Sequence, residues 1–275
     1  MAADPERIAA VIDRLVSSVV QRDGWVDPAA RRHKAKTDGS RVTDLDQAIE
    51  TEWRSIIGNE FPGHTIVGEE FGSNDRESDY VWILDPIDGT DDFTRGIPLF
   101  GYLIALTHNG VPIAAAAGHP LLGVDVRAGR GEGTTIGGNT IRPFESDAPS
   151  DPAIAIPAAD DFLRQEDRTE LLRDIGKRFR NYRVYRNLFG HTSVVRGALQ
   201  AGLEFDVAEW DFLATRLMIE ESGGLFRYFR VVQQDNLRKY GVVFGHPDTV
   251  SRLCNILREH GYECASADDF DALGV

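Results

Sequence analysis

Cysteine is scarce in this sequence of 275 residues, which has only Cys254 and Cys264. Two cysteines do not make the disulfide framework of a small secreted domain, and a chain of this length can bury a substantial hydrophobic core. The cysteines and the seven histidines show no zinc-ligand spacing. The composition therefore excludes a disulfide-rich scaffold and a zinc site held by Cys and His.

Positive charge is also in short supply. Thirty Lys and Arg residues are outnumbered by 44 Asp and Glu residues, so the formal net charge is −14 at pH 7. Nucleic-acid binding needs a basic footprint for the phosphate backbone, so we expect no nucleic-acid partner. Divalent cations bound to the carboxylates would still allow a phosphorylated small molecule to bind.

Long hydrophobic runs are absent. No apolar segment approaches the ~20 residues needed to cross a bilayer, and residues 1–6 lack the basic and apolar stretches of a signal peptide. The shares of hydrophobic residues, 42%, and charged residues, 27%, are ordinary for a soluble globular protein. We therefore expect a cytoplasmic protein that does not bind membranes.

A hexapeptide carries the strongest chemical signal in the chain. Residues 85–90 read Asp-Pro-Ile-Asp-Gly-Thr and follow the apolar run 80–84. Asp85 and Asp88 offer the oxygen ligands that Mg²⁺ prefers, and Gly89 lets the backbone approach a phosphate closely. A loop that merely caps a helix is often built from the same residue types, so the hexapeptide alone does not decide between the two.

Other acidic segments favour the metal site. Residues 66–70 read Ile-Val-Gly-Glu-Glu, a second short apolar run that ends in carboxylates. Open α/β sheets bind their ligands at such strand ends. Asp46 lies upstream in the first turn of an expected helix, and Asp211 opens an apolar-periodic segment far downstream. Simple helix capping remains the alternative for Thr43, Asp44 and Asp211.

Hydrophobic periodicity predicts a mixed α/β chain. Asp4-Pro5 suits a helix start and precedes apolar residues at helical spacing. Asn109-Gly110 between two apolar runs predicts a β-hairpin. Residues 23–42 are expected to be a polar loop. Further helices are expected at about 44–57, 160–175, 191–201, from 211 to a C-cap at Gly223, and 248–259, and further strands at 124–128, 153–156, 182–185, 204–208 and 240–244.

Composition changes over 143–152, where Pro, Glu, Ser and Asp accumulate. We interpret this stretch as the boundary between an N-terminal α+β subdomain, residues 1–145, and a C-terminal α/β subdomain, residues 146–275. The glycine-rich segment 129–133 superficially resembles a dinucleotide-binding loop, but no helix pattern follows it. We expect glycine turns between antiparallel strands there.

Together the motifs resemble those of the inositol monophosphatase family of Mg²⁺-dependent phosphomonoesterases. Gly68-Glu-Glu70, the hexapeptide 85–90, and Trp210-Asp211 followed by Gly223-Gly224 occur in the family's order. The similarity runs from about residue 8 to 260. It implies a layered α-β-α-β-α sandwich with the active site between two subdomains, two or three Mg²⁺ ions, and a homodimer.

The resemblance also implies how the metal ions are held. Glu69, Asp85 and the Ile87 backbone carbonyl would bind the first ion. Asp85, Asp88 and Asp211 would bind the second, so that Asp85 bridges the two.

The same resemblance implies catalytic and phosphate-binding roles. Thr90 and Glu69 would orient and deprotonate the attacking water, with Asp46 holding the Thr90 hydroxyl. The N–H groups of Gly89 and Thr90 would bind the phosphate, and Lys36 is a further candidate for that task.

Several segments look more like the histidinol-phosphate phosphatase branch than inositol monophosphatase itself. They are Lys36–Thr43, Gly68–Gly72, Phe93–Pro98, Leu103–Leu106 and Asp206–Glu209. We therefore expect a histidinol phosphatase of histidine biosynthesis, ahead of an enzyme for inositol 1-phosphate or another sugar or nucleotide monoester. The cationic amine of histidinol favours a nearby carboxylate, and Glu204, Asp206 and Glu209 are the candidates; a solvated strand end is the alternative for all three.

Two departures from the family pattern leave the alcohol open. Glu209 directly precedes Trp210, where the family usually has several more residues, and Arg186-Asn187 stands where it often has Gly-Asp. Both regions normally contact the alcohol. Alternatives of other classes are a catalytically inactive metal-binding regulatory protein on this fold and a dinucleotide-binding enzyme that uses the glycine loop.

Overall fold

The structure is a computed structural model that describes residues 4–35, 41–74, 76–157, 162–163, 166–185, 187–234, 237–266 and 269. Lys36 and Arg186 lie outside these residues, so the predictions that involve them have no structural counterpart here.

The larger sheet of the described residues has eight strands in the order β10-β9-β8-β7-β6-β5-β3-β4. Its strands β3 and β5 are parallel neighbours, whereas the other neighbours are antiparallel. Parallel strands finish at the same edge of a sheet. The strands are β3 (Thr65–Gly68), β4 (Gly72–Ser73), β5 (Tyr80–Asp88), β6 (Gly101–His108), β7 (Val111–His119), β8 (Val124–Gly129), β9 (Gly133–Ile136) and β10 (Asn139–Ile141).

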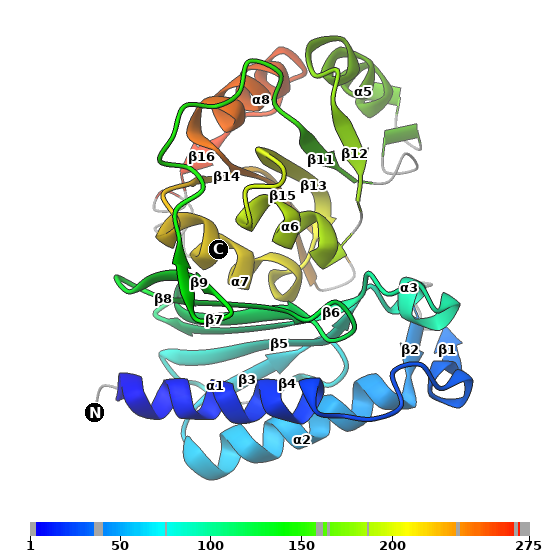
Figure 1. The fold of residues 1–275 in the computed structure, drawn as a ribbon, viewed down its shortest axis with the longest axis vertical. Coiled ribbons are helices and arrows are strands. Elements are labelled where there is room, and N and C mark those ends of the chain that lie inside the picture. Colours follow the sequence, from blue (N-terminus) through cyan, green and yellow to red (C-terminus); the bar gives the residue numbers. More distant parts are fainter. Residues whose placement is uncertain are drawn as a thin grey trace.

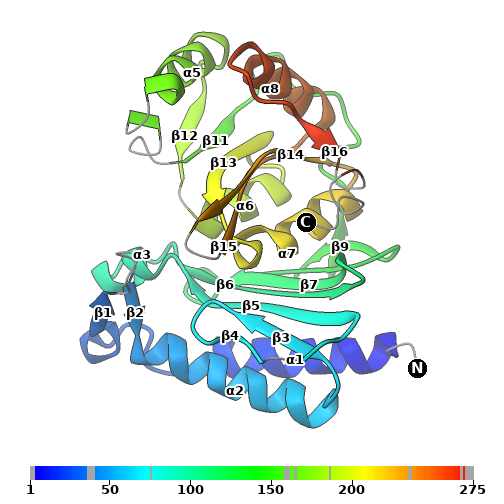
Figure 2. The ribbon, with the colours of Figure 1, turned by 180° about the vertical axis from the view of Figure 1, so that it is seen from behind.

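Helices α1 (Pro5–Val20) and α2 (Asp44–Glu60) cover the outer face of this sheet (Figures 1 and 2). The Asp4 carboxylate accepts a hydrogen bond from the Glu6 N–H and Pro5 takes the first helical position, so the predicted start of α1 is confirmed. Helix α2 starts as predicted behind a Thr43 cap and runs on to Glu60. A short helix, α3 (Thr90–Arg95), follows β5.

The smaller sheet of the described residues has the strand order β12-β11-β13-β15-β14-β16. Helices α6 (Asn187–Val195) and α7 (Glu209–Glu221) lie between the two sheets, and α5 (Glu166–Arg178) and α8 (Pro247–Glu259) cover the far face (Figure 1). This order of layers confirms the predicted α-β-α-β-α sandwich. The strands are β11 (Ile154–Ile156), β12 (Tyr182–Val184), β13 (Ala201–Val207), β14 (Leu225–Gln234), β15 (Leu237–Gly245) and β16 (Ala265–Ser266).

Three hydrophobic clusters hold the layers together. One joins α1 and α2 to the larger sheet through side chains such as Trp53 and Trp82. The central cluster packs α6 and α7 between the sheets and includes Phe212 and Phe244. The third, with Leu253, joins α5 and α8 to the smaller sheet. Burial of apolar surface between layers is the dominant favourable contribution to such a fold.

The two sheets are built from separate parts of the chain. The larger sheet uses strands between residues 65 and 141, and the smaller one uses strands between residues 154 and 266. The stretch between them contains the Pro- and Ser-rich segment, and the division into two subdomains stays a prediction. In the described part of the chain, no helix combines the length and apolar character that a bilayer crossing needs.

Several predicted elements were misplaced or missed. The helix expected at 191–201 is α6, which spans Asn187–Val195, and seven of its nine residues are buried, so it offers no polar face from which to read a period. The strand expected at 204–208 is β13, Ala201–Val207. Strand β14, Leu225–Gln234, was not predicted, because two bulky residues in succession, Tyr228 and Phe229, are both buried and interrupt the alternation.

The polar loop expected over 23–42 is wrong in part. It contains a 3-10 turn, Pro28–Arg31, and strand β1 (His33–Ala35), which pairs antiparallel with β2 (Arg41–Thr43). All three residues of β1 are exposed, so this ribbon has no buried face to reveal it in the sequence.

Candidate active site

The ends of β3 and β5 bring the two acidic motifs together. Gly68 pairs with Leu84 in the parallel register, so the next residues along the strands are Glu69 and Asp85. The Glu69 N–H donates to the Leu84 carbonyl at 3.1 Å and extends the ladder past the end of β3. Two carboxylates of separate motifs therefore meet at one edge of the sheet.

A third element adds another carboxylate. Helix α7 starts at Glu209 and carries Asp211 in its first turn. Ligand oxygens of Asp85, Asp88 and Asp211 all lie within 4.8 Å of one another. The Asp211 carboxylate also accepts a hydrogen bond from the Ala208 N–H at 2.7 Å, so the capping alternative and membership of the cluster hold together. Strand β5 and helix α7 thus converge on one acidic centre.

The Asp85 carboxylate lacks a partner that a buried charge requires. Asp85 is 1% exposed; its Oδ1 accepts the Ile87 N–H at 3.1 Å, and within the described residues its Oδ2 has no hydrogen-bond donor. Burial, and after it the charges of Glu69, Asp88 and Asp211, raise the pKa of Asp85 well above its ordinary value. A divalent cation would supply the missing partner, so these residues fit a metal ion.

Asp88 is held in the same environment. Burial and the neighbouring Asp211 charge raise the pKa of Asp88 well above its usual range, while a hydrogen bond from the Leu188 N–H opposes this. Leu188 lies at the start of α6, so α6, like α7, contributes to the site from between the sheets.

Thr90 and Asp46 form the polar wall beside the cluster. The Thr90 hydroxyl lies 3.2 Å from Asp46 Oδ1 and 2.9 Å from the Ile87 carbonyl, and both oxygens can accept its proton. The other carboxylate oxygen of Asp46 accepts the Thr43 N–H at 2.8 Å in the capping box of α2. Burial is the main cause that raises the pKa of Asp46 to about 6, and the charge of Glu69 adds to it.

Gly89 gives the chain its turn between β5 and α3. Its φ of 83° is left-handed, and a Cβ there would lie 3.0 Å from Asn187 Nδ2 and 3.4 Å from the Phe100 backbone. A larger residue would be strained and crowded at this position. The turn lets Asp88 and Thr90 sit on opposite sides of one residue and face the same cavity.

A cavity of about 350 Å³ lies beside the cluster and is lined by Asp88, Thr90 and Asp211 among others. Four of its lining residues were not assigned a role from the sequence: Arg41, Asp91, Asp92 and Asn187. Asp91 and Asp92 directly follow the hexapeptide, and this position in the sequence could have identified them as site residues. Asn187 has a left-handed φ of 59°, which the sequence does not reveal. The described lining residues are Arg41, Glu69, Ile87, Asp88, Gly89, Thr90, Asp91, Asp92, Asn187 and Asp211.

The three carboxylates expected to recognise the alcohol are not among these lining residues. Glu204 is buried, with Oε1 3.9 Å from His191 Nε2. His191 Nδ1 lies 2.9 Å from the Thr215 hydroxyl oxygen, and burial lowers the pKa of His191 to about 3, so the ring is neutral at pH 7. His191 is a buried residue of α6 and is not among the described residues that line the cavity.

Asp206 and Glu209 are likewise engaged within the protein. Asp206 forms ion pairs with Arg168 at 2.8 Å and Arg230 at 3.3 Å. Glu209 accepts a hydrogen bond from the Tyr240 hydroxyl at 2.8 Å.

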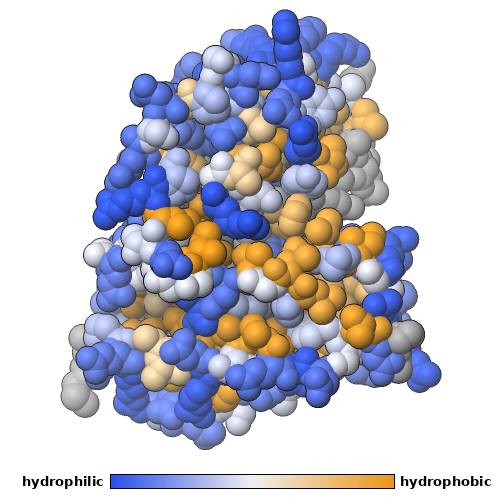
Figure 3. Space-filling model, viewed as in Figure 1, coloured by the Kyte–Doolittle hydropathy of each residue, from blue (hydrophilic) through white to orange (hydrophobic). Residues whose placement is uncertain are grey.

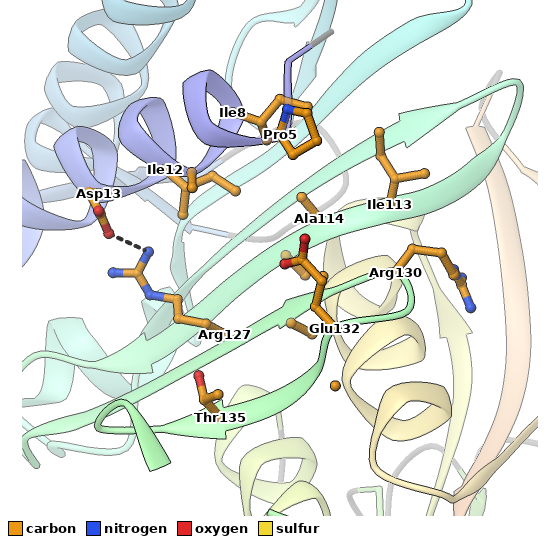
Figure 4. Close-up of a pocket in the computed structure, with 15 residues that line it drawn as sticks. Pro5, Ile8, Ile12, Asp13, Ile113, Ala114, Arg127, Arg130, Glu132 and Thr135 are labelled. Carbon is orange, nitrogen blue, oxygen red and sulfur yellow. Dashed lines mark hydrogen bonds and ion pairs between the residues drawn. The ribbon is translucent and has the colours of Figure 1, made fainter. Parts of the chain in front are cut away.

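A second cavity, of about 440 Å³, lies between α1 and strands β7, β8 and β9 (Figure 4). Ile8, Ile12 and Ile113 give it an apolar lining, and its Arg127 is paired with Asp13 at 3.4 Å. Residues 129–133 border it as a turn in which Gly129 pairs with Gly133 between antiparallel strands. The predicted glycine turn is confirmed, and it leads directly into strand β9 instead of the helix that a dinucleotide site needs.

Known proteins resemble this chain over most of its length. The profile of the inositol monophosphatase family matches residues 7–262. Histidinol-phosphatase of Mycobacterium tuberculosis is 31% identical over 198 residues, covering 70% of this chain and 76% of that protein. Nus factor SuhB of Pseudomonas aeruginosa is 28% identical over 239 residues, 80% of this chain and 83% of that protein.

A solved structure matches the whole architecture. The crystal structure of the extragenic suppressor protein suhB from Bartonella henselae superposes with a TM-score of 0.79 at 20% identity, covering 92% of this chain and 98% of that one. This likeness concerns the fold, while the profile match and the sequence relatives concern ancestry. The chain belongs to the inositol monophosphatase family, a family of metal-dependent phosphatases.

Proposed function

We propose that this protein is a Mg²⁺-dependent phosphomonoesterase whose preferred substrate is a phosphorylated amino alcohol such as histidinol phosphate. The observation that carries the proposal is the buried Asp85 carboxylate, which has an oxygen without a donor in the described residues and shares a 4.8 Å cluster with Asp88 and Asp211. Such a group is costly to bury ionised unless a cation joins it.

Two Mg²⁺ ions would be held by the clustered oxygens. Glu69, Asp85 and the Ile87 carbonyl would hold the first, and Asp85, Asp88 and Asp211 the second. When bound, the ions would neutralise charge on the phosphoryl oxygens and the leaving alkoxide and lower the pKa of water.

The protein's own groups would then position the attacking water. Because the Thr90 hydroxyl proton points to the Asp46 carboxylate or the Ile87 carbonyl, the Thr90 oxygen can accept a hydrogen bond from a water in the cavity. The capping box holds Asp46 in place for this task. Glu69, which lines the same cavity, would take up the water proton. The Gly89 and Thr90 N–H groups would orient the phosphate, for which Lys36 remains a prediction.

Acidic side chains in the cavity wall support a cationic alcohol. Two Mg²⁺ ions would balance the four carboxylates that hold them, which leaves Asp91, Asp92 and Arg41 among the described charged lining residues. Arg41 pairs with Asp91 at 2.9 Å. Asp92 lines the same cavity, and its charge contributes to the raised pKa of Asp88. We propose that Asp92 receives the substrate amine, a task for which Glu204, Asp206 and Glu209 are less well placed.

Phosphate release from a panel of monoesters tests the proposed function. The panel contains histidinol phosphate, inositol 1-phosphate, fructose 1,6-bisphosphate and adenosine 3′,5′-bisphosphate, each with Mg²⁺ and with excess EDTA. We expect the highest kcat/KM for histidinol phosphate, and no turnover in EDTA. Another preferred substrate would contradict the assigned alcohol; turnover in EDTA would contradict the metal-dependent mechanism.

Asp92→Asn tests the recognition of the amine. A hydrogen bond to a charged group contributes about 1.5–3 kcal/mol, so kcat/KM for histidinol phosphate should fall at least ~10-fold. Asp206→Asn is the matched control and should change kcat/KM for histidinol phosphate little. Inositol 1-phosphate, which has no amine, should be hydrolysed equally by both variants; an equal loss on both substrates would argue against amine recognition.

An inactive regulatory protein on the same fold is the alternative of another class. The intact set of Glu69, Asp85, Asp88 and Asp211 argues against it, because a degenerate site is expected to have lost a ligand. Absence of phosphate release from every monoester, with Mg²⁺ present, would favour this alternative.

We further propose that two copies of the chain form a homodimer. Hydrophobic side chains gather in a band across the middle of one face (Figure 3). Exposed large hydrophobic residues include Leu121 and Leu122, adjacent in the turn between β7 and β8. Size-exclusion chromatography with light scattering should give twice the chain mass; the mass of a single chain would contradict the proposal.

A further inference from the structure

Three charged residues of α2 are spaced one helical turn apart along one side of the helix. Asp46, Glu50 and Arg54 follow each other at intervals of four residues, which places them in one line along the helix. Asp46 is 1% exposed and Glu50 is fully buried. Charged side chains inside a protein are costly, so each one calls for a specific partner. Asp46 is hydrogen-bonded to Thr43 and Thr90, whereas Glu50 and Arg54 bind other groups.

Glu50 binds the backbone just beyond Glu69. Its Oε2 accepts the Glu70 N–H at 2.8 Å, and its Oε1 lies 3.3 Å from the Phe71 nitrogen, which also donates to it. The Arg54 Nε donates to Glu50 Oε1 at 2.8 Å. A carboxylate that accepts two backbone N–H groups and a guanidinium is well satisfied although it is buried.

Arg54 closes the other side of the same turn. Its Nη2 donates to the Gly72 carbonyl, so the ion pair binds N–H groups of residues 70 and 71 and the carbonyl of residue 72. Arg54 is 18% exposed in its side chain, whereas Glu50 has none exposed. The pair therefore fixes the turn between β3 and β4 against α2.

Gly68 shows how closely Glu50 approaches this turn. A Cβ at residue 68 would lie 2.1 Å from Glu50 Oε1 and 2.7 Å from Oε2. Only glycine allows the carboxylate to lie against the backbone here. Glu69 is thus held on both sides, by its own N–H bond to the Leu84 carbonyl and by the clamped amides that follow it.

We propose that Glu50, supported by Arg54, is a positioning residue that fixes the Glu69 carboxylate for metal binding. This inference rests on the metal role assigned to Glu69 under the proposed function. Glu50 is not among the residues that line the cavity, and both its oxygens are engaged, so it acts through the turn. Partners that orient a metal ligand typically contribute 10–100-fold to metal affinity.

The test is calorimetric titration of the metal-free full-length protein with Mn²⁺, in the absence of substrate. Glu50→Gln keeps the side-chain shape but removes the charge and one acceptor, and Mn²⁺ affinity should fall about 10–100-fold. Glu52→Gln makes the same chemical change on the exposed face of α2 and should leave the affinity within about twofold. In activity assays, the Mg²⁺ concentration for half-maximal rate should rise in Glu50→Gln, with most of kcat recovered at saturating Mg²⁺.

A purely structural clamp would give a different pattern. Glu50→Gln would then lower the melting temperature but bind Mn²⁺ like the wild type, and that result would overturn the inference. If Glu50→Gln does not fold, Arg54→Gln decides: it removes the bond to Glu50 and the bond to Gly72, and unchanged Mn²⁺ affinity in this variant would equally overturn it.

The inference and the proposed function fail in distinguishable ways. Wild-type protein that hydrolyses no monoester, with Mn²⁺ binding still weakened by Glu50→Gln, contradicts the function and supports the positioning role. Wild-type turnover, together with unaltered Mn²⁺ affinity in both variants, supports the function and contradicts the positioning role. Wild-type protein that binds no Mn²⁺ contradicts both.

Discussion

Asp46 Oδ1 lies 3.2 Å from the Thr90 hydroxyl oxygen, although 44 residues separate the two in the sequence. Asp46 belongs to the first turn of α2, where its other oxygen completes the capping box with Thr43. The Asp46 side chain thus helps to cap the start of a helix in the outer layer and also contacts Thr90, the residue that follows Asp88 and Gly89. The rotamer that the cap requires is also the rotamer that the site uses.

Asp46→Asn tests this double role. The amide keeps an acceptor for Thr90 but loses the negative charge, so kcat should fall about 100-fold, the lower end of what general acid–base groups contribute. Mn²⁺ affinity should stay near the wild-type value, because Asp46 is not assigned as a ligand. Asp44→Asn changes an exposed residue of the same helix turn and serves as the control. A folded Asp46→Asn variant with kcat within threefold of the wild type would refute the role.

The pH dependence of stability in the metal-free protein follows from the buried carboxyls. Burial is the main cause that raises the pKa of Asp46 from 3.8 to about 6, and it also raises the pKa of Asp85 and of Asp88 well above 3.8. The folded state therefore binds more protons than the unfolded state, and stability is lost as pH rises from about 4 through 6 and beyond. Thermal unfolding in EDTA should show a falling melting temperature over this range.

Mg²⁺ should reverse that loss. The cation binds the ionised carboxylates and protons compete with it, so the rise in melting temperature on adding Mg²⁺ should be larger at pH 8 than at pH 5. At 100 times Kd the gain is about 2.7 kcal/mol. NaCl at equal ionic strength is the control for screening. An Mg²⁺ effect of equal size at both pH values would speak against carboxylate ligands.

Asp85→Asn provides the matched variant for the same measurement. The amide removes a buried charge, so the metal-free variant should be more stable than the wild type at pH 8 and should gain little from Mg²⁺. If Asp85→Asn still gained as much from Mg²⁺ as the wild type, the cation would bind elsewhere.

Gly68→Ala should disturb the site through Glu50. The added methyl group would displace the Glu50 carboxylate from the Glu70 and Phe71 amides, at a cost of about 1–3 kcal/mol for overpacking. Metal affinity should fall together with stability. Gly58→Ala is the control: a Cβ added there would meet no atom within 4 Å apart from the adjacent backbone of α2, and alanine should stabilise α2 by about 0.5–1 kcal/mol. Wild-type stability in Gly68→Ala would contradict this prediction, because the turn would then accommodate the methyl group without cost.

Much of this fold could be predicted from local patterns. Helices α1, α2 and α8 have a buried apolar stripe and a capping residue, and the β6–β7 hairpin has Asn109-Gly110 at its turn. The carboxylates of the cluster were also identifiable, because each follows a short apolar run or opens a helix. The profile match and the relatives confirm the family and the fold, and the individual roles remain proposals.

Other parts depend on tertiary contacts that leave no local trace. Glu50 appears as an ordinary helix glutamate until the β3–β4 turn is seen against it. Asn187 enters the cavity through a left-handed backbone conformation, and the start of α6 was placed four residues too late. The candidates for alcohol recognition came from the family pattern, whereas the cavity wall comes from the packing of α3, β2 and α6 around it.

The central claim is that Asp85, Asp88 and Asp211 share divalent metal ions. Anomalous scattering from crystals grown with Mn²⁺ and phosphate tests it most directly. We expect anomalous peaks within ~2.3 Å of carboxylate oxygens of all three residues, with Asp85 contacting more than one ion and phosphate density beside them. Crystals in which the three carboxylates hold no anomalous peak, while phosphate binds elsewhere, would contradict the account.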